Sequence, residues 1–84
     1  MTYRVEVTRS AVKALRRVNP ADAARLRGAI AMLAEDPRPP ASRPLRGRDG
    51  WRLTVGHYRV LYTIRDAVLL IVVVTLAHRS SAYR

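Results

Sequence analysis

The feature that most constrains the fold is an alternating stretch in the second half of the chain, residues 44–62, PLRGRDGWRLTVGHYRVLY. Apolar and polar side chains alternate through WRLTV, residues 51–55, a period of two that places them on opposite faces of a strand. The dipeptide Val55-Gly56 then supplies a two-residue turn, and residues 57–64 return as a second strand. The stretch therefore predicts a loop that enters a β-hairpin.

This turn also predicts which side chains face each other across the hairpin. On the polar face its register sets Arg52 opposite Arg59, and Thr54 opposite His57. The residues expected to share the apolar face are Trp51, Leu53, Tyr58 and Val60. Like charges directly opposite each other destabilise a sheet, whereas two guanidiniums on a rigid hairpin form a bidentate site for phosphate. The pair indicates an anion site, the alternative being arginines that are simply solvated on an exposed face.

The charge of the chain supports an acidic partner. Its 84 residues contain 16 Lys and Arg against 6 Asp and Glu, a formal net charge of +10. This excess favours nucleic acid, an acidic protein or an anionic membrane surface. The length suits one domain with a single modest core, residues 1–84. There is no cysteine, which excludes disulfides and thiolate chemistry, and two histidines without a carboxylate cluster argue against a metal site.

The most apolar segment, residues 68–77 (VLLIVVVTLA), is too short to cross a membrane, because a membrane helix needs roughly 20 apolar residues. It predicts a buried strand in the middle of a sheet. Arg65-Asp66 before it predicts a second tight turn, so that residues 58–64 and 67–76 form another hairpin. The N-terminus, MTYRVEVTRS, does not read as a signal peptide, which makes the cytoplasm the expected location.

The first half of the chain predicts one strand and two helices. Alternation through residues 3–7 indicates a strand with one buried face. A helix capped by Thr8 or Ser10 follows, and an Asn-Pro dipeptide ends it and opens a second helix that extends to about Glu35. Their apolar stripes are Ala11, Ala14, Leu15 and Val18 in the first helix and Ala23, Leu26, Ile30 and Leu33 in the second.

Together these segments predict an α+β fold. After the N-terminal strand and the αα-hairpin, the prolines of residues 36–40 (DPRPP) favour a stiff, extended connector. The connector leads into an antiparallel three-strand meander. The expected architecture is a four-stranded antiparallel sheet with both helices packed on one face, in a single domain.

In order and spacing, these motifs resemble the RelE branch of the RelE/ParE superfamily, the toxin halves of bacterial toxin–antitoxin pairs. The resemblance rests on PLRG, on G-x-Y-R-x-x-Y in GHYRVLY and on H-R-x-x-x-Y in HRSSAY, and it extends over nearly the whole chain. It implies a RelE-like fold and a metal-independent endoribonuclease, without cofactor, that cuts mRNA codons in the A site of the ribosome. It also implies a RelB-like antitoxin, acidic and folding on binding, with operator DNA reached only through the antitoxin complex. No membrane partner is implied.

The resemblance also assigns roles to individual residues. Arg59 matches the active-site arginine of the Y-R motif, and Arg52 falls where RelE toxins carry a basic residue on the preceding strand. Arg79 and Tyr83 match the C-terminal arginine and tyrosine of the catalytic set. Thr54 departs from the pattern, because well-studied relatives carry a second lysine there. The residues expected to bind substrate are Arg46, Arg48, Thr54, His57 and His78.

The chemistry of such a site follows from the reaction. RNA cleavage by its own 2′-hydroxyl needs a base for that proton, cations for the charge of the transition state and an acid for the leaving 5′-oxygen. Our hypothesis gives charge stabilisation to Arg52 and Arg59, and leaving-group stabilisation or protonation to Arg79. Tyr83 would orient or activate the 2′-hydroxyl, or stack on a base. His57 or Arg48 would supply the charge that Thr54 lacks.

Two other functions stay open on the sequence. One is a ParE-like toxin of the same fold, which inhibits DNA gyrase by binding and has no nuclease chemistry; the clustered arginines and tyrosine argue against it. The other is a catalytically inactive nucleic-acid-binding module, a co-repressor with its antitoxin, which Thr54 keeps open. Net charge does not separate the three, because non-specific affinity for nucleic acid follows from charge in each.

Other conspicuous side chains have simpler interpretations. The aromatic residues expected in the core, rather than stacked on bases, are Trp51, Tyr58 and Tyr62. The cations of the first helix are Arg9, Lys13, Arg16 and Arg17. They coat either a solvated face or a surface for ribosomal RNA or the antitoxin.

Overall fold

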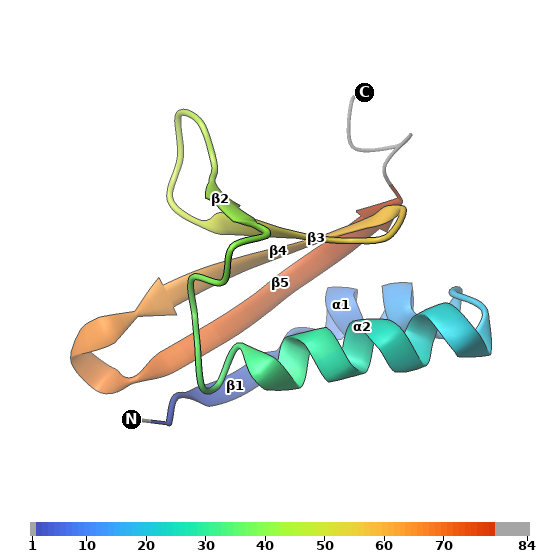
Figure 1. Ribbon diagram of the computed structural model, residues 1–84, viewed down its shortest axis with the longest axis horizontal. Helices are drawn as coiled ribbons and strands as arrows, with labels where there is room; N and C mark the ends of the chain where they lie inside the picture. The colour runs from blue at the N-terminus through green and yellow to red at the C-terminus, as the bar shows by residue number, and fades with distance from the viewer. Residues whose placement is uncertain (1, 79–84) are drawn as a thin grey trace.

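The computed structural model describes residues 2–78. Its elements are β1 (Arg4–Val7), α1 (Arg9–Arg16), α2 (Pro20–Met32), β2 (Ser42–Pro44), β3 (Trp51–Val55), β4 (Tyr58–Arg65), the short 3-10 helix η1 (Asp66–Val68) and β5 (Leu70–His78). In this part of the chain the strands form one five-stranded sheet, in the order β1-β5-β4-β3-β2. Both helices lie on the same side of the sheet (Figure 1). The predicted α+β class is confirmed.

The two helices begin where capping residues were predicted. Thr8 has an extended backbone, and its side chain accepts a hydrogen bond from the N–H of Ala11. Asn19 accepts from the N–H of Asp22 at 2.9 Å, and Pro20 occupies the first turn of α2. These contacts satisfy N–H groups that a helix start leaves without partners. No helix within residues 2–78 is long and apolar enough to span a membrane.

The core lies between the helices and the face of the sheet that they cover. Its largest fully buried side chains are Tyr62, Leu26, Leu33, Ile71, Val60 and Val73. The predicted stripes of both helices point into it, and Trp51 and Tyr58 pack against its edge. The hydroxyl of Tyr62 donates to the carbonyl of Pro37 at 2.7 Å, and burial raises the pKa of this tyrosine. The core aromatics are therefore placed as predicted.

The sheet differs from the prediction in its number of strands and in one strand direction. Residues just after the predicted connector form β2, a three-residue edge strand antiparallel to β3 that was not predicted. Pro44 ends this strand, which an edge permits because proline has no N–H to give to a ladder. β1 pairs with β5 in parallel, so the sheet is mixed rather than wholly antiparallel. The strand after the second turn also begins late, at Leu70, because η1 and a left-handed Leu69 precede it.

The connector is fixed to the sheet at the end remote from the β3–β4 turn. Arg38 forms an ion pair with Asp66, Nη2 to Oδ2 at 2.8 Å, and the hydroxyl of Tyr3 donates to the other carboxylate oxygen at 2.6 Å. The Arg38 guanidinium lies 5.3 Å from the ring centroid of Trp51. We call Tyr3, Arg38, Trp51 and Asp66 the anchored end. The hydrogen bond from Arg38 holds the pKa of Asp66 below its ordinary value.

Candidate functional site

The face of the sheet opposite the helices, the outer face, carries the predicted polar side chains of the hairpin. Because Leu53 and Val60 point into the core, alternation places Arg52, Thr54 and Arg59 on the outer face. Strands β2, β3, β4 and β5 contain no aspartate or glutamate. Positive charge on this face therefore has no acidic neighbour within the four strands.

The hairpin turn lies one residue later than predicted. Its two central residues are Gly56 and His57, so that Val55 pairs with Tyr58. Gly56 has a φ of 58° and occupies the first central position, where type II′ hairpin turns place a glycine. The sequence interpretation put the same glycine at the second position, as a type I′ turn also allows. The residue that marks the turn was therefore correct and its place in the turn was wrong.

This difference changes the pairing of the predicted site. Arg52 faces Leu61, and Arg59 faces Thr54. The predicted pairs, Arg52 with Arg59 and Thr54 with His57, are both wrong. Each residue of β3 faces a position two further along β4 than predicted, and a shift of two leaves every side chain on its expected face. The two arginines thus share the outer face as diagonal neighbours, within reach of long side chains.

Arg52 and Arg59 are both half-buried, and the Nε atom of Arg59 is shielded from solvent. The neighbours of Arg59 across the ladders are Thr54 on β3 and Ala77 on β5. The chain continues from β5 directly into the segment that carries Arg79 and Tyr83. Those two predicted catalytic residues lie outside the described residues.

A cation that the sequence interpretation missed lies on the next strand. Arg43 of β2 directly faces Arg52 of β3. With Arg46 and two apolar residues, Pro44 and Leu45, these arginines line a surface hollow of about 500 Å³. Arg52 therefore does face an arginine, but that arginine is Arg43 on β2 and not the predicted Arg59. Three residues, S-R-P, are too few to reveal strand alternation, and the flanking prolines favoured a connector.

The loop between β2 and β3 carries the two remaining predicted arginines. It is closed by a hydrogen bond from the N–H of Leu45 to the carbonyl of Gly50 at 2.9 Å. Gly50 has a φ of 124°, and a Cβ there would meet the Tyr62 carbonyl at 3.2 Å, so glycine is required for the close approach. Arg46 and Arg48 are both exposed on this loop, but only Arg46 borders the hollow.

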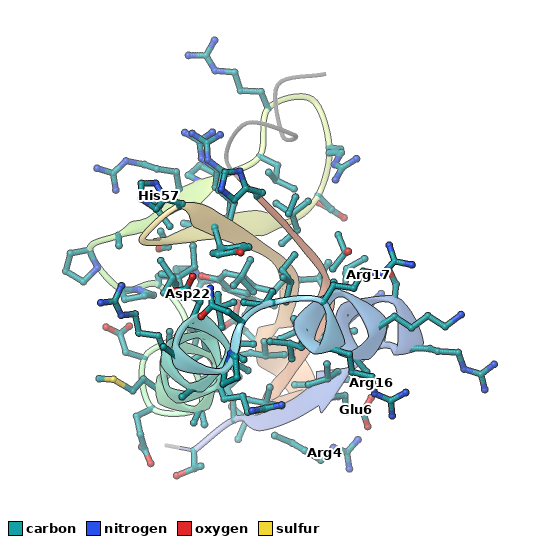
Figure 2. The ribbon with its side chains drawn as sticks, turned by 90° about the vertical axis from the view of Figure 1, so that its right-hand side faces the viewer. Arg4, Glu6, Arg16, Arg17, Asp22 and His57 are labelled. Carbon is teal, nitrogen blue, oxygen red and sulfur yellow. The ribbon has the colours of Figure 1, made fainter. Side chains whose placement is uncertain are left out.

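The two predicted histidines come together beside the β3–β4 turn. The rings of His57 and His78 stack with centroids 6.1 Å apart, and Tyr58 meets His78 edge-on at 5.2 Å. Figure 2 shows His57 at the end of the molecule away from Arg4 and Glu6 of β1. Within residues 2–78 no group of three or more His, Cys, Asp or Glu is placed to hold a metal ion.

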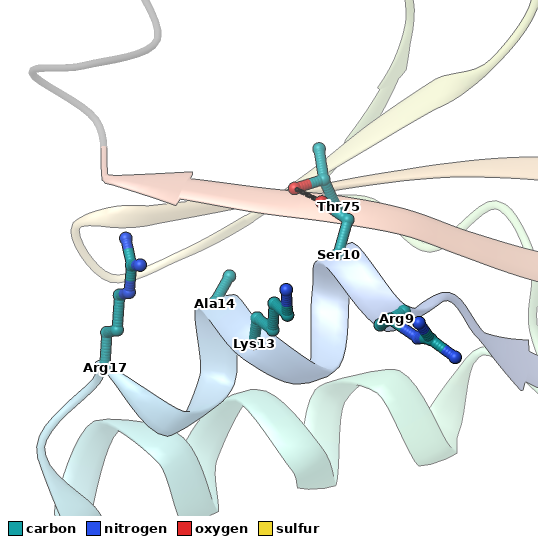
Figure 3. Close-up of a pocket in the computed structure, with 6 residues that line it drawn as sticks. All are labelled: Arg9, Ser10, Lys13, Ala14, Arg17 and Thr75. Atoms are coloured by element: carbon teal, nitrogen blue, oxygen red, sulfur yellow. Dashed lines mark hydrogen bonds between the residues drawn. The ribbon is translucent and has the colours of Figure 1, made fainter.

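A second basic surface runs along α1. Arg9, Lys13 and Arg17 line a hollow of about 460 Å³ against β5, where the hydroxyl groups of Ser10 and Thr75 lie 3.3 Å apart (Figure 3). Ala11 and Leu15 on the opposite side of the helix are buried, which leaves the cations outward as predicted. The hollow presents cations and hydroxyls, a combination that suits phosphate groups.

Known proteins of similar sequence and structure agree with this fold. The profile of a family described as the ParE toxin of the type II toxin–antitoxin system parDE matches residues 5–83. No curated protein matches the sequence. Among solved structures, the chain is similar to the archaeal RelE–RelB complex from Pyrococcus horikoshii OT3, with 30% identity, 94% of this chain and 97% of that chain covered, and a TM-score of 0.84.

Two further structures extend the comparison. The toxin–antitoxin complex RelBE2 from Mycobacterium tuberculosis is 28% identical, with 94% of this chain and 100% of that chain covered and a TM-score of 0.80. The isolated RelE toxin of E. coli is 24% identical, covers 96% of this chain and 90% of that chain, and has a TM-score of 0.77, a likeness of fold alone. With the profile match over residues 5–83, the chain belongs to the RelE/ParE superfamily of type II toxin–antitoxin toxins.

Proposed function

We propose that this toxin is an endoribonuclease that cleaves mRNA codons in the A site of the ribosome, in the cytoplasm, and that a cognate antitoxin neutralises it. The observation that carries the proposal is the outer face of the β3–β4 hairpin, where Arg52 and the half-buried Arg59 lie on strands without any acidic residue. Cations at such a site are suited to the charge that builds up on a phosphate in its transition state.

The roles follow from the chemistry of cleavage by the 2′-hydroxyl. Arg59 stabilises charge on the scissile phosphate, because its Nε atom is shielded from solvent. Arg52 supplies a second cation on the same face, and Arg79 stabilises or protonates the leaving 5′-oxygen. Tyr83 orients the 2′-hydroxyl. His57 and His78 lie beside the β3–β4 turn and contact the RNA there.

The antitoxin belongs to the same proposal. Several structural relatives were solved as complexes of RelE with RelB. For a chain of net charge +10, an acidic segment that folds on binding is the complementary partner. Such a segment would cover the cationic outer face and keep RNA away, and operator DNA would be bound only through the complex.

Gyrase inhibition is the second candidate. The observation in its favour is that the matching profile is that of ParE toxins, whereas the most similar structures named above are RelE toxins. A gyrase inhibitor acts by binding and has no need of Arg59 on an open face beside the end of β5. The arginines of the outer face therefore favour the ribonuclease.

Primer extension on mRNA from programmed ribosomes, with the toxin freed of its antitoxin, tests the proposal. We expect cuts at A-site codons with the wild type and with Arg65→Ala, and none with Arg59→Ala. Arg65 is a matched control because it lies on the same strand and face as Arg59, about 20 Å away. No cuts with the wild type, together with inhibited supercoiling by gyrase, would assign the chain to the second candidate. If neither activity were observed, the remaining candidate would be a catalytically inactive nucleic-acid-binding module.

A further inference from the structure

The outer face holds a pair of arginines that the folding of the sheet does not explain. Arg43 on β2 and Arg52 on β3 occupy directly opposed positions. Opposed like charges destabilise a sheet. The ion pairs Arg4–Glu6 and Arg38–Asp66 lie elsewhere, on β1 and at the anchored end, and among residues 2–78 no carboxylate forms an ion pair with Arg43 or Arg52. An anion bound between the two guanidiniums would remove the repulsion.

The Arg43 guanidinium is held in place rather than freely solvated. Its Nη1 atom donates to the carbonyl of Pro40 at 2.9 Å and to the carbonyl of Ser42 at 2.7 Å. A charge that only protects an edge strand against pairing with other chains needs no fixed direction. Both described bonds use Nη1, whereas Nε and Nη2 form the other edge of the fork, which binds phosphate side-on.

The surroundings of the pair suit one unit of a nucleic acid backbone. Arg46 adds a third cation to the hollow of about 500 Å³, and Pro44 and Leu45 supply an apolar wall. A phosphodiester offers charge to the guanidiniums and a ribose and base to the wall. The hollow is continuous with the face that carries Arg59, because Arg52 borders both.

The spacing of the rows on the outer face indicates how RNA would lie. Arg59 stands in the row of Thr54, and the Arg43–Arg52 pair stands in the row two residues earlier on β3. Arg52 and Arg59 are diagonal neighbours on adjacent strands, a separation of about 7–8 Å, which is comparable with that of consecutive phosphates along an extended strand. We propose that the Arg43–Arg52 pair binds the phosphodiester next to the scissile one in single-stranded RNA, an inference that rests on the proposed ribonuclease function.

The salt dependence of RNA binding tests the site without requiring cleavage. Fluorescence anisotropy with a short labelled single-stranded RNA is measured over a series of salt concentrations for the wild type, Arg43→Ala and Arg65→Ala. For single strands each phosphate contact contributes about 0.7 to the slope of log affinity against log salt. We expect Arg43→Ala to lose about 0.7 of this slope and about tenfold in affinity at low salt, and Arg65→Ala to keep the wild-type slope.

The control separates a local contact from the loss of one charge in a basic protein. Equal slopes for Arg43→Ala and Arg65→Ala would overturn the proposal, whether both fell or both stayed. Arg43→Lys keeps the charge without the fork, and we expect it to retain the slope and to recover only part of the affinity. If Arg43→Ala kept the RNA slope but weakened the complex with an acidic antitoxin peptide, the pair would be an antitoxin contact instead.

Cleavage of a chemically altered mRNA locates the bound phosphate. A methylphosphonate, which has no charge, replaces the phosphodiester on either side of the scissile one, and single-turnover cleavage is measured on programmed ribosomes. At one of the two positions wild type and Arg43→Ala should cleave at the same rate, whereas on unmodified mRNA the variant should be about tenfold slower. A variant that is equally slower at both positions contradicts the placement. If the salt slopes of RNA binding differed between Arg43→Ala and Arg65→Ala but the wild type cleaved no mRNA, the ribonuclease function would be refuted and the anion site would stand.

Discussion

Arginine has opposite relations to its neighbours at the two ends of the β3–β4 hairpin. At the anchored end, Arg38 pairs with Asp66 and lies over Trp51. Toward the turn, Arg52 faces Arg43, another cation, and Arg59 faces the neutral Thr54. The first arrangement neutralises charge between segments distant in sequence, and the second concentrates charge on an open face. One residue type therefore forms an ion pair with a carboxylate at one end and, in our proposal, binds an anion at the other.

In so basic a chain, the neighbours of an arginine indicate its function better than its charge does. Positive charge by itself says little, because sixteen Lys and Arg are spread over 84 residues. The two ends differ in whether the neighbouring elements place a carboxylate beside the arginines. Asp66 is present where the connector is held, whereas strands β2, β3, β4 and β5 contain no aspartate or glutamate. A substitution at one end of the hairpin should therefore affect stability and activity differently from a substitution at the other.

The largest effect is expected for Arg59→Ala in cleavage. Removing one preorganised group that stabilises transition-state charge typically lowers the rate by a factor of about 10²–10³. Because the residue opposite Arg59 on β3 is the neutral Thr54, we expect its loss to leave the free energy of unfolding within about 1 kcal/mol of the wild-type value. Single-turnover cleavage and urea unfolding measure the two quantities. A variant that lost stability and activity together would show that this end also holds the fold.

The next effect concerns stability beside the anchored end. Tyr62→Phe removes the hydroxyl of a buried side chain that donates to the carbonyl of the half-buried Pro37. We expect the free energy of unfolding to fall by about 0.5–1.5 kcal/mol. Cleavage activity should stay close to wild type, since Tyr62 points into the core. Urea unfolding curves that coincide with those of the wild type would show that this hydrogen bond does not stabilise the fold.

A smaller effect of opposite sign is expected for Arg52→Thr. The change removes the repulsion with Arg43 and puts a β-branched residue on the strand, which should raise the free energy of unfolding by about 0.2–1 kcal/mol. At the same time RNA binding should weaken. Arg65→Thr is the control for strand propensity, because it makes the same replacement on the outer face without an opposed arginine. Lower stability in Arg52→Thr than in Arg65→Thr would contradict repulsion at the site.

The smallest effect is a pH dependence at the anchored end. The hydrogen bond from Arg38 lowers the pKa of Asp66 relative to the unfolded chain. The stabilisation is therefore complete above the ordinary aspartate pKa and is lost as pH falls through that value toward the lowered one. The difference in unfolding free energy between wild type and Asp66→Asn should shrink between neutral pH and about pH 3. A difference that does not change with pH would mean that the charge of Asp66 is not what matters.

Much of the fold could be predicted from the sequence because local signals were strong. Thr8, Asn19 and Pro20 marked the helix starts, and the apolar stripes identified the core faces. β2 could not be predicted, since a three-residue strand acquires its structure from pairing with β3 rather than from its own residues. The parallel pairing of β1 with β5 likewise depends on contacts between distant segments.

The site was predictable as a face and not as a set of pairs. Alternation correctly placed Arg52, Thr54 and Arg59 on the outer face. A register shift of two residues preserves every face, so the pattern could not distinguish the predicted pairing from the one found. Only the position of Gly56 within the turn decides it. The roles given to Arg79 and Tyr83 lie outside the described residues and stay predictions.

The pairing of β1 with β5 has a consequence for the order in which the molecule forms. Arg4 lies beside Leu70, so the first strand made during synthesis waits for the last one before it gains a partner. Contacts between such distant segments require closure of a long loop and slow folding. The meander of β3, β4 and β5 is local and can form earlier. The nascent toxin would therefore complete its sheet only when synthesis has passed β5, and until then β1 has no neighbouring strand and is open to pairing with other chains.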